Sequence, residues 1–256
     1  FHHKGIYAGA YSSPAYYGAA QLYHMLHDTP FALSDVARSN IRQALLTYRA
    51  IANTYEVPTG INGRMPFDHF DLANILAAYA FMALSGDPVD KEMAGVFMRL
   101  WKPESEIVQR ELIRHARVSI SYMHTLGSLQ MMMDLGAQSY DAEEAPVGHW
   151  AKNYGAVSVH RRGEWAVSVK GWSKYVWDYE RHTTQNIFGR YISYGAIQIV
   201  GSGDPVTQAA SGYVEEGWDW SRWPGTTAIY LPLDEVVDLD EDRNRCFSDQ
   251  PFVGGV

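Results

Sequence analysis

The sequence predicts an α+β protein in which helices come first and an antiparallel sheet follows. Between residues 14 and 135, apolar side chains recur at the spacing of amphipathic helices. From about Tyr154 they alternate with polar ones, as in half-buried strands. The polar stretch 136–150 separates the two patterns and is interpreted as a linker. We therefore expect a helical part over residues 1–140 and a sheet part over residues 141–256.

The helical part is expected to contain several helices joined by short links, as in bundles or toroids of paired helices. The first begins at Pro14, which suits a first helical turn, and ends at Asp28-Thr29-Pro30. Ser34 can cap a second helix that continues to Ile51. The remaining helices are expected at residues 68–84, 89–101, 104–116 and 121–135.

The sheet part begins with a hairpin. Valines at alternate positions lie on both sides of the polar sequence Arg161-Arg162-Gly163-Glu164, which is interpreted as the turn. Further strands are expected at 191–200 and 226–231, between loops rich in glycine and proline.

Composition excludes several classes of protein. The chain has 256 residues, of which 46% are hydrophobic and 13% aromatic, so it can bury a substantial core. Its net charge of −8 argues against a nucleic-acid partner. No apolar run reaches the roughly 20 residues that span a bilayer, so no membrane partner is expected. A single cysteine, Cys246, excludes an internal disulfide.

The opening segment, FHHKGIYAGAYSSP, has the composition of a proton-transfer site. An unperturbed imidazole titrates near neutral pH, and a phenol can do so if nearby cations stabilise its anion. The segment supplies the imidazoles of His2 and His3, the phenols of Tyr7 and Tyr11, and the cation of Lys4. The alternative is a loop whose aromatic side chains only pack.

Three further stretches have an unusual composition. In GINGRMPF, Arg64 offers a guanidinium fork that matches a carboxylate or a sulfate. In VWDYERHTTQNIFGRY, Glu180 could orient a cation or a phenol, and Asn186 could hydrogen-bond an uncharged carboxyl group. In EEGWDWSRWPGTT, Trp218 and Trp220 could stack on sugar rings. A structural role, in a loop or in the sheet core, is the alternative for each.

Two clusters of cations could attract an anionic ligand despite the negative net charge, because clefts focus the electric field. One is His2-His3-Lys4 and the other is His160-Arg161-Arg162, so His2 and Arg161 join the residues expected to bind substrate. Solvated surface charge is the alternative. The sequence has no GxGxxG, P-loop, CxxC or HExxH motif, so we predict no required cofactor and no metal ligands.

Several motifs follow one another along the chain: His3 with YSSPA, LYHMLHDTPFAL, NGRMPF, YVWDYE with NIFGRY, and GWDWSRWPGTT. In order and spacing they resemble the polysaccharide lyases of family eight, over nearly the whole chain. Within that family the likeness is greatest to the chondroitin ABC-type lyases, through the histidine–YSxPA pattern, the RxPF loop and the EEGWDW run.

The resemblance implies the C-terminal part of an incomplete α/α toroid followed by the start of an antiparallel β-supersandwich. It also implies a monomeric, secreted or periplasmic enzyme that binds an acidic polysaccharide. The substrates would be chondroitin sulfate and dermatan sulfate, with hyaluronan as a further candidate, cut by β-elimination at a uronic acid. A divalent cation as an aid to the reaction is left open.

Position by position, the resemblance assigns the catalytic roles. Tyr11 falls on the tyrosine that acts as base for glucuronate and as acid to the leaving oxygen. His3 falls on a histidine that helps to position the carboxyl group and can serve as base for the opposite C5 epimer, with His2 as a lesser rival. Arg64 matches an arginine beside the tyrosine, where its charge would stabilise the phenolate. Glu180 matches the glutamate that completes this network.

The chain also departs from the family pattern. Asp68 stands where AC-type enzymes carry a second arginine, which weakens an AC-type assignment. Their carboxylate-holding asparagine would precede Phe1, and because the chain opens without Met, we expect an internal fragment of a longer protein. A one-residue shift between His3 and Tyr11 leaves Tyr7 as a weaker candidate.

Two other classes of function stay open. A glycoside hydrolase on a helical toroid would need two carboxylates flanking the scissile bond, and Glu180 has no obvious partner in the sequence. A non-catalytic glycan-binding protein would show no turnover. An unsaturated, ultraviolet-absorbing product distinguishes elimination from both.

Overall fold

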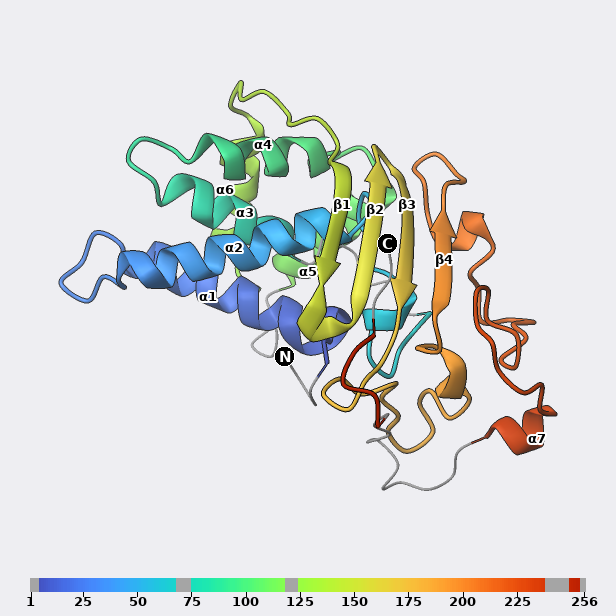
Figure 1. Ribbon diagram of the computed structural model, residues 1–256. Coiled ribbons are helices and arrows are strands. Elements are labelled where there is room, and N and C mark those ends of the chain that lie inside the picture. The colour runs from blue at the N-terminus through green and yellow to red at the C-terminus, as the bar shows by residue number, and fades with distance from the viewer. Residues whose placement is uncertain (1–4, 68–74, 118–123, 238–248, 254–256) are drawn as a thin grey trace. The chain divides into compact units, whose positions relative to one another are not determined.

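The structure is a computed structural model that describes residues 5–67, 75–117, 124–237 and 249–253. The chain divides into two compact units. One comprises Ser12–Arg49 and Asp71–Ala145 and is helical; the other comprises Phe1–Tyr11, Ala50–Phe70 and Pro146–Val256 and carries the sheet. The helices of the helical unit precede the strands along the chain, as predicted, and one short helix follows the strands (Figure 1). The predicted boundary at residue 140 stays a prediction.

The helical unit is built around one fully buried helix. Its helices are α1 (Ser13–Leu26), α2 (Asp35–Ile51, whose last two residues belong to the other unit), α3 (Leu76–Leu84), α4 (Lys91–Leu100), α5 (Glu106–Ala116) and α6 (Leu126–Gly136). The sequence of α3, LAAYAFMAL, is apolar on all sides, and a helix of that kind must be covered by its neighbours. It packs against α1, α4 and α6, and every residue from Leu76 to Ala83 is buried.

The predicted helices are confirmed, with corrections at some ends. The hydroxyl of Ser34 accepts the N–H of Ala37 at 3.3 Å, so α2 begins where the sequence predicted. The expected start of the last helix at 121 lies outside the described residues. Helix α6 begins at Leu126, where Thr125 caps it: the Thr125 Oγ1 accepts the N–H of Ser128 at 3.0 Å. The expected start of the third helix at 68 lies outside the described residues, and α3 is described from Leu76.

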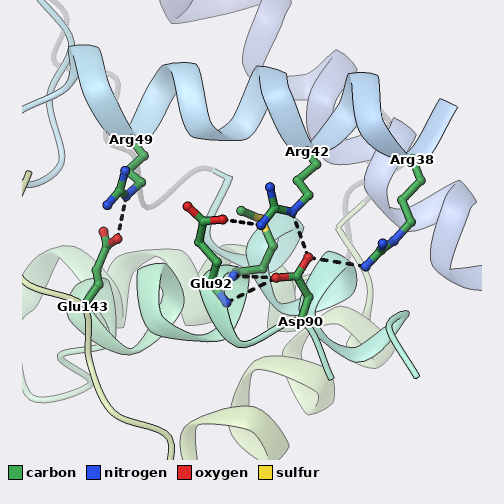
Figure 2. Close-up of polar contacts among 7 residues, drawn as sticks. Arg38, Arg42, Arg49, Asp90, Glu92 and Glu143 are labelled. Atoms are coloured by element: carbon green, nitrogen blue, oxygen red, sulfur yellow. Dashed lines mark hydrogen bonds and ion pairs between the residues drawn. The ribbon is translucent and has the colours of Figure 1, made fainter. Parts of the chain in front are cut away.

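Ion pairs join α2 to the N-terminus of α4 (Figure 2). Arg42 Nε lies 2.9 Å from Asp90 Oδ2, Arg38 Nη2 lies 3.3 Å from the same atom, and Arg42 also pairs with Glu92. Asp90 is the N-cap of α4 and accepts the N–H groups of Glu92 and Met93. Burial alone would raise its pKa, but the hydrogen bond from Arg42, the N–H of Met93 and the arginine charges outweigh it, so the pKa of Asp90 is lowered. Further along α2 and α4, Glu143 pairs with Arg49 at 2.5 Å and with Arg99 at 2.8 Å.

The sheet is an antiparallel meander of order β1-β2-β3-β4 (Figure 1). Its strands are β1 (Val147–Lys152), β2 (Val157–Arg162), β3 (Trp165–Lys170) and β4 (Ala196–Val200). The predicted hairpin is confirmed, but its turn is shorter than expected. Arg161 and Arg162 belong to β2 and pair with Ala166 and Trp165, which leaves Gly163 and Glu164 as the turn. Gly163 has φ +64°, a conformation that favours glycine in two-residue hairpins.

Three other sheet predictions need correction. The predicted linker 136–150 contains the start of β1, an edge strand whose sequence VGHWAK lacks a clear apolar alternation. The predicted strand 191–200 is reduced to β4, because Tyr191 closes a 3₁₀ turn (Gly189–Tyr191). The predicted strand 226–231 joins no ladder. Among its residues, Ile229 accepts a hydrogen bond from the Tyr191 hydroxyl at 2.9 Å instead.

The sheet-bearing unit also has short helical turns. These are a π-helical turn (Ala8–Ser12, whose last residue belongs to the helical unit), 3₁₀ turns (Thr59–Ile61, Asn153–Gly155 and Ala209–Ser211), and α7 (Leu233–Val236). Among the described residues, no helix is both long and apolar enough to cross a membrane.

Candidate active site

Three of the four residues predicted to be catalytic form one hydrogen-bonded chain in the sheet-bearing unit. Arg64 Nη2 donates to the Tyr11 hydroxyl at 2.9 Å. Its other terminal nitrogen, Nη1, donates to Glu180 Oε1 at 2.9 Å. One guanidinium therefore bridges a phenol and a carboxylate that are far apart in the sequence, as the arginine fork allows.

Local structure places each of the three side chains. Tyr11 lies on the π-helical turn that precedes α1. Arg64 follows Gly63, which has φ +66° and whose added Cβ would lie 2.0 Å from the ring of Tyr7. Only glycine therefore fits at position 63, both for backbone conformation and for space. Glu180 lies in the segment between β3 and the 3₁₀ turn at 189, and its backbone oxygen accepts a 2.7 Å hydrogen bond from Asn186 Nδ2.

Exposure increases along this chain of groups. The Glu180 side chain is 9% exposed and that of Arg64 is 18% exposed, whereas Tyr11 is 47% exposed. Burial raises the pKa of Glu180, and the charge and hydrogen bond of Arg64 and the charge of His182 oppose this only in part. Burial acts to lower the pKa of Arg64, but the Tyr11 hydrogen bond and the charge interactions with Tyr7 and Glu180 raise it overall. The guanidinium is therefore a permanent cation held against an accessible phenol.

Tyr7, the weaker candidate for the base, has a different environment. It is 2% exposed, and its ring meets that of Tyr11 edge to face at 5.1 Å. Burial and, after it, the nearby Glu180 charge raise the pKa of Tyr7 to about 12, despite the opposing effect of Arg64. A phenol so placed keeps its proton and supports the Tyr11 ring by packing. The geometry thus favours Tyr11 over Tyr7.

The other predicted site residues are not all brought to this chain of groups. His2, His3 and Asp68 lie outside the described residues. Asn186 contacts the hydrogen-bonded chain of Tyr11, Arg64 and Glu180 through its bond to the Glu180 carbonyl. The Oδ1 atom of Asn186 has no hydrogen-bond partner among the described residues, and the backbone φ of this residue is +56°. Arg161 is fully buried in β2, where Nη2 donates to the Gly163 carbonyl at 2.9 Å.

The tryptophans predicted to stack on sugars lie in an aromatic cluster. Trp220 is 7% exposed and packs edge to face on Phe67 at 5.4 Å. Trp218 is partly buried and lies 5.3 Å from the same ring. Trp223 stacks on the Phe67 ring, with the ring centroids 6.0 Å apart. These contacts match the alternative of a sheet core with partly buried indoles, and sugar stacking by Trp218 and Trp220 stays a prediction.

Sequence reasoning missed a small cavity that Glu180 lines. It has a volume of about 40 Å³, and its charged and titratable lining side chains include Tyr7, Lys170, Asp178 and Glu180. Nothing in the sequence distinguished Lys170 from a solvated lysine at the end of a strand. Among the described residues, no group of three or more His, Cys, Asp or Glu side chains could hold a metal ion.

Comparison with known proteins gives two family matches. The model described as "Lyase, catalytic" matches residues 1–106, and the model described as "Polysaccharide lyase family 8, super-sandwich domain" matches residues 148–256. Together with the order of helices and antiparallel sheet, these matches confirm the predicted fold class, a toroid portion followed by the start of a β-supersandwich.

Individual relatives give the same picture. The chain is 32% identical over 273 residues to chondroitin sulfate ABC exolyase of Bacteroides thetaiotaomicron, covering 100% of this chain and 26% of that protein. It is 31% identical over 242 residues to chondroitin sulfate ABC endolyase of Proteus vulgaris, and the match covers 94% of this chain and 21% of that protein. The solved structure of Streptomyces coelicolor A3 chondroitin AC lyase in complex with chondroitin sulphate shares the fold, with a TM-score of 0.62 and 19% identity over 86% of this chain and 30% of its own. The chain thus spans about a quarter of the length of the curated relatives it matches.

Proposed function

Because the chain belongs to polysaccharide lyase family 8, we propose that it carries the catalytic centre of an enzyme that cleaves uronic-acid-containing glycosaminoglycans by β-elimination. The substrates we propose are chondroitin sulfate and dermatan sulfate, with hyaluronan as a further candidate. Two curated relatives are named for chondroitin sulfate, which supports this choice. We place the enzyme in the secreted or periplasmic compartment, where such polymers are accessible, and propose that it acts as a monomer.

The chemistry explains why these residue types would be needed. The hydrogen on C5 of a uronate is very weakly acidic while the adjacent carboxylate is charged, so that charge must be neutralised or hydrogen-bonded. Tyr11, as phenolate, would then accept the C5 proton. The C5–H electron pair forms the C4=C5 double bond, the C4–O bond breaks, and the leaving O4 takes the proton back from Tyr11. The products are an unsaturated uronate and a free hydroxyl end.

The observation that carries the proposal is the bridge that Arg64 makes between Tyr11 and Glu180, with both hydrogen bonds at 2.9 Å. A fixed cation at this distance stabilises the phenolate that the first step needs. Glu180 fixes the guanidinium plane, because it occupies the nitrogen that does not face Tyr11. Asn186 holds the Glu180 segment through the backbone carbonyl of Glu180.

The remaining predicted residues complete the proposal. His3, with His2 as its rival, would help to position the carboxyl group and could serve as base for the iduronate epimer in dermatan. Arg161, Trp218 and Trp220 stay predicted substrate-binding residues. No cofactor is required by this chemistry, and assistance by a divalent cation is left open.

The proposal is tested by incubating the full-length protein separately with chondroitin sulfate, dermatan sulfate and hyaluronan and following ultraviolet absorbance of the double bond. Tyr11→Phe keeps the ring and its packing but removes the reacting oxygen, so the rate should fall by at least about 10²-fold, the lower end for one positioned acid–base group. A glycan-binding protein would give no absorbing product at all. A hydrolase would release reducing ends without absorbance. Cleavage by Tyr11→Phe at the wild-type rate would refute the role of this phenol.

A further inference from the structure

The cavity beside Glu180 contains a buried cation that the proposed reaction does not use. Lys170 ends β3, is 6% exposed, and lines the cavity. Its Nζ donates to the Gly171 carbonyl at 2.5 Å, and this is its one hydrogen-bond partner among the described residues. An ammonium group has three N–H donors, so two remain for the cavity.

The cavity has charged groups in its lining and is large enough for water. Its volume is about 40 Å³, whereas one water needs roughly 10–15 Å³ and two to four polar partners. Such partners are provided by Lys170 and by two carboxylates, those of Asp178 and Glu180, which line the same space. Asp178 is 3% exposed, and its Oδ1 accepts the N–H of Tyr179 at 2.8 Å.

The lysine stem is fixed in place by the neighbouring loop. A Cβ added at Gly60 would lie 2.8 Å from both Cβ and Cγ of Lys170, so this backbone packs directly on the stem. Ordering the long lysine side chain normally costs conformational entropy, which makes a merely incidental buried lysine unfavourable. A buried ammonium also needs compensating negative charge, and Asp178 supplies it.

The charges around the cavity balance when Lys170 is protonated. Asp178 and Glu180 supply two carboxylates, against the ammonium of Lys170 and the guanidinium of Arg64, which pairs with Glu180. If Lys170 is neutral, the cavity loses that charge, and the charges of Arg64 and His182 are left to act on Glu180. The buried Glu180 then gains a proton more easily.

We propose that Lys170 is a positioning residue of this site: water in the cavity links its ammonium to Asp178 and Glu180, and this keeps Glu180 charged and aligned with Arg64. The inference rests on the proposed function, because the effect is transmitted through Arg64 to Tyr11.

A dependence on pH follows. Burial lowers the pKa of Lys170 to about 7, and Asp178 opposes this only in part. The ammonium is therefore present below that pH and is lost above it. The titratable groups that line the cavity with it are Asp178 and Glu180, from the segment after β3, and Tyr7, from the opening segment. The pKa of Tyr7, about 12, keeps this phenol neutral here. The loop lines the cavity with Gly60 and Gly63, and its one charged side chain, Arg64, pairs with Glu180.

The test measures kcat/KM against pH for the full-length protein and four variants. Lys170→Met should lower kcat/KM at pH 6 about tenfold or more. It should also lose the decline in kcat/KM that we expect of the wild type as pH rises through about 7. Asp178→Asn should also lower kcat/KM at pH 6. The double variant should be no worse than the poorer single one, because removing both partners leaves no uncompensated charge. Lys174→Met, which removes the same charge from an exposed position nearby, should keep the wild-type profile.

A Lys170→Met enzyme with wild-type activity and an unchanged pH profile would overturn the inference. So would a double variant whose losses simply multiply. An Asp178→Asn enzyme with wild-type kcat/KM would also overturn it, and this result can be read even if Lys170→Met folds poorly. A wild type that cleaves none of the three polymers refutes the proposed function instead, and this inference falls with it.

Discussion

Replacing Arg64 by lysine tests how the bridge works, because the positive charge is kept and the fork is lost. Arg64 makes two charge-assisted hydrogen bonds, to Tyr11 and to Glu180, each at 2.9 Å. A lysine ammonium is a point charge on a flexible stem and cannot reproduce both directions at once. At least one of the two bonds should therefore be lost or lengthened.

The size of the effect follows from the contacts. A hydrogen bond to a charged group contributes about 1.5–3 kcal/mol, and because solvent reaches 18% of the Arg64 side chain we take a value near the lower end, about 2 kcal/mol. Since 1.4 kcal/mol corresponds to a factor of ten, kcat/KM should fall roughly 30-fold. The loss should appear mainly in kcat, because in the proposed mechanism Arg64 stabilises the Tyr11 phenolate during proton transfer.

The assay follows double-bond absorbance at several substrate concentrations, so that kcat and KM separate, and checks by thermal unfolding that the variant is folded. Arg222→Lys is a matched control: Arg222 is 72% exposed and stacks on Tyr230, so the same substitution there should leave kcat/KM within twofold. If Arg64→Lys is also within twofold of wild type while Tyr11→Phe is inactive, the guanidinium does not stabilise the phenolate and the reasoning is wrong.

Two further predictions concern protonation. Burial raises the pKa of Glu180, so activity should decline on acidification at a pH above the pKa of an ordinary glutamate. Glu180→Gln should abolish this decline along with most activity. A variant whose activity still declines at the same acidic pH as the wild type would contradict the assignment. The lowered pKa of Asp90 means that its charge stabilises the fold above the unfolded-state pKa and loses this effect as pH falls through the folded value. Asp90→Asn should therefore unfold about 2 kcal/mol more easily at pH 7, and the difference from wild type should shrink on acidification, as measured by denaturant unfolding at both pH values.

The helical half of the fold was predictable because its signals are local. Pro14 and Ser34 mark helix starts by side-chain chemistry that acts within one turn, and the buried helix α3 is apolar on every side. The sheet was less predictable, because strands depend on distant partners. β1 pairs through its backbone with β2, although its own sequence has no apolar alternation. The segment 226–231 has the composition of a strand but pairs with no strand in the part of the chain that the structure describes.

The site shows the same division. Tyr11, Arg64 and Glu180 were identified by residue type and family resemblance, and the structure brings their polar atoms together. Lys170 could not be identified, because its burial depends on Gly60, which is more than a hundred positions away in the sequence.

The order of burial along the chain of groups explains how a single phenol could act first as base and then as acid on a polymer. A polysaccharide cannot enter a closed pocket, so the reacting oxygen must lie where solvent reaches, as Tyr11 does at 47% exposure. Fixed charges act more strongly when they are withdrawn from water, and Arg64 and Glu180 are largely buried beside it. The phenol can therefore gain and lose a proton while the ion pair that tunes it keeps its charge and position. Exposing Glu180, or burying Tyr11, would remove one of these two conditions, and with it the ability of one oxygen to serve both steps.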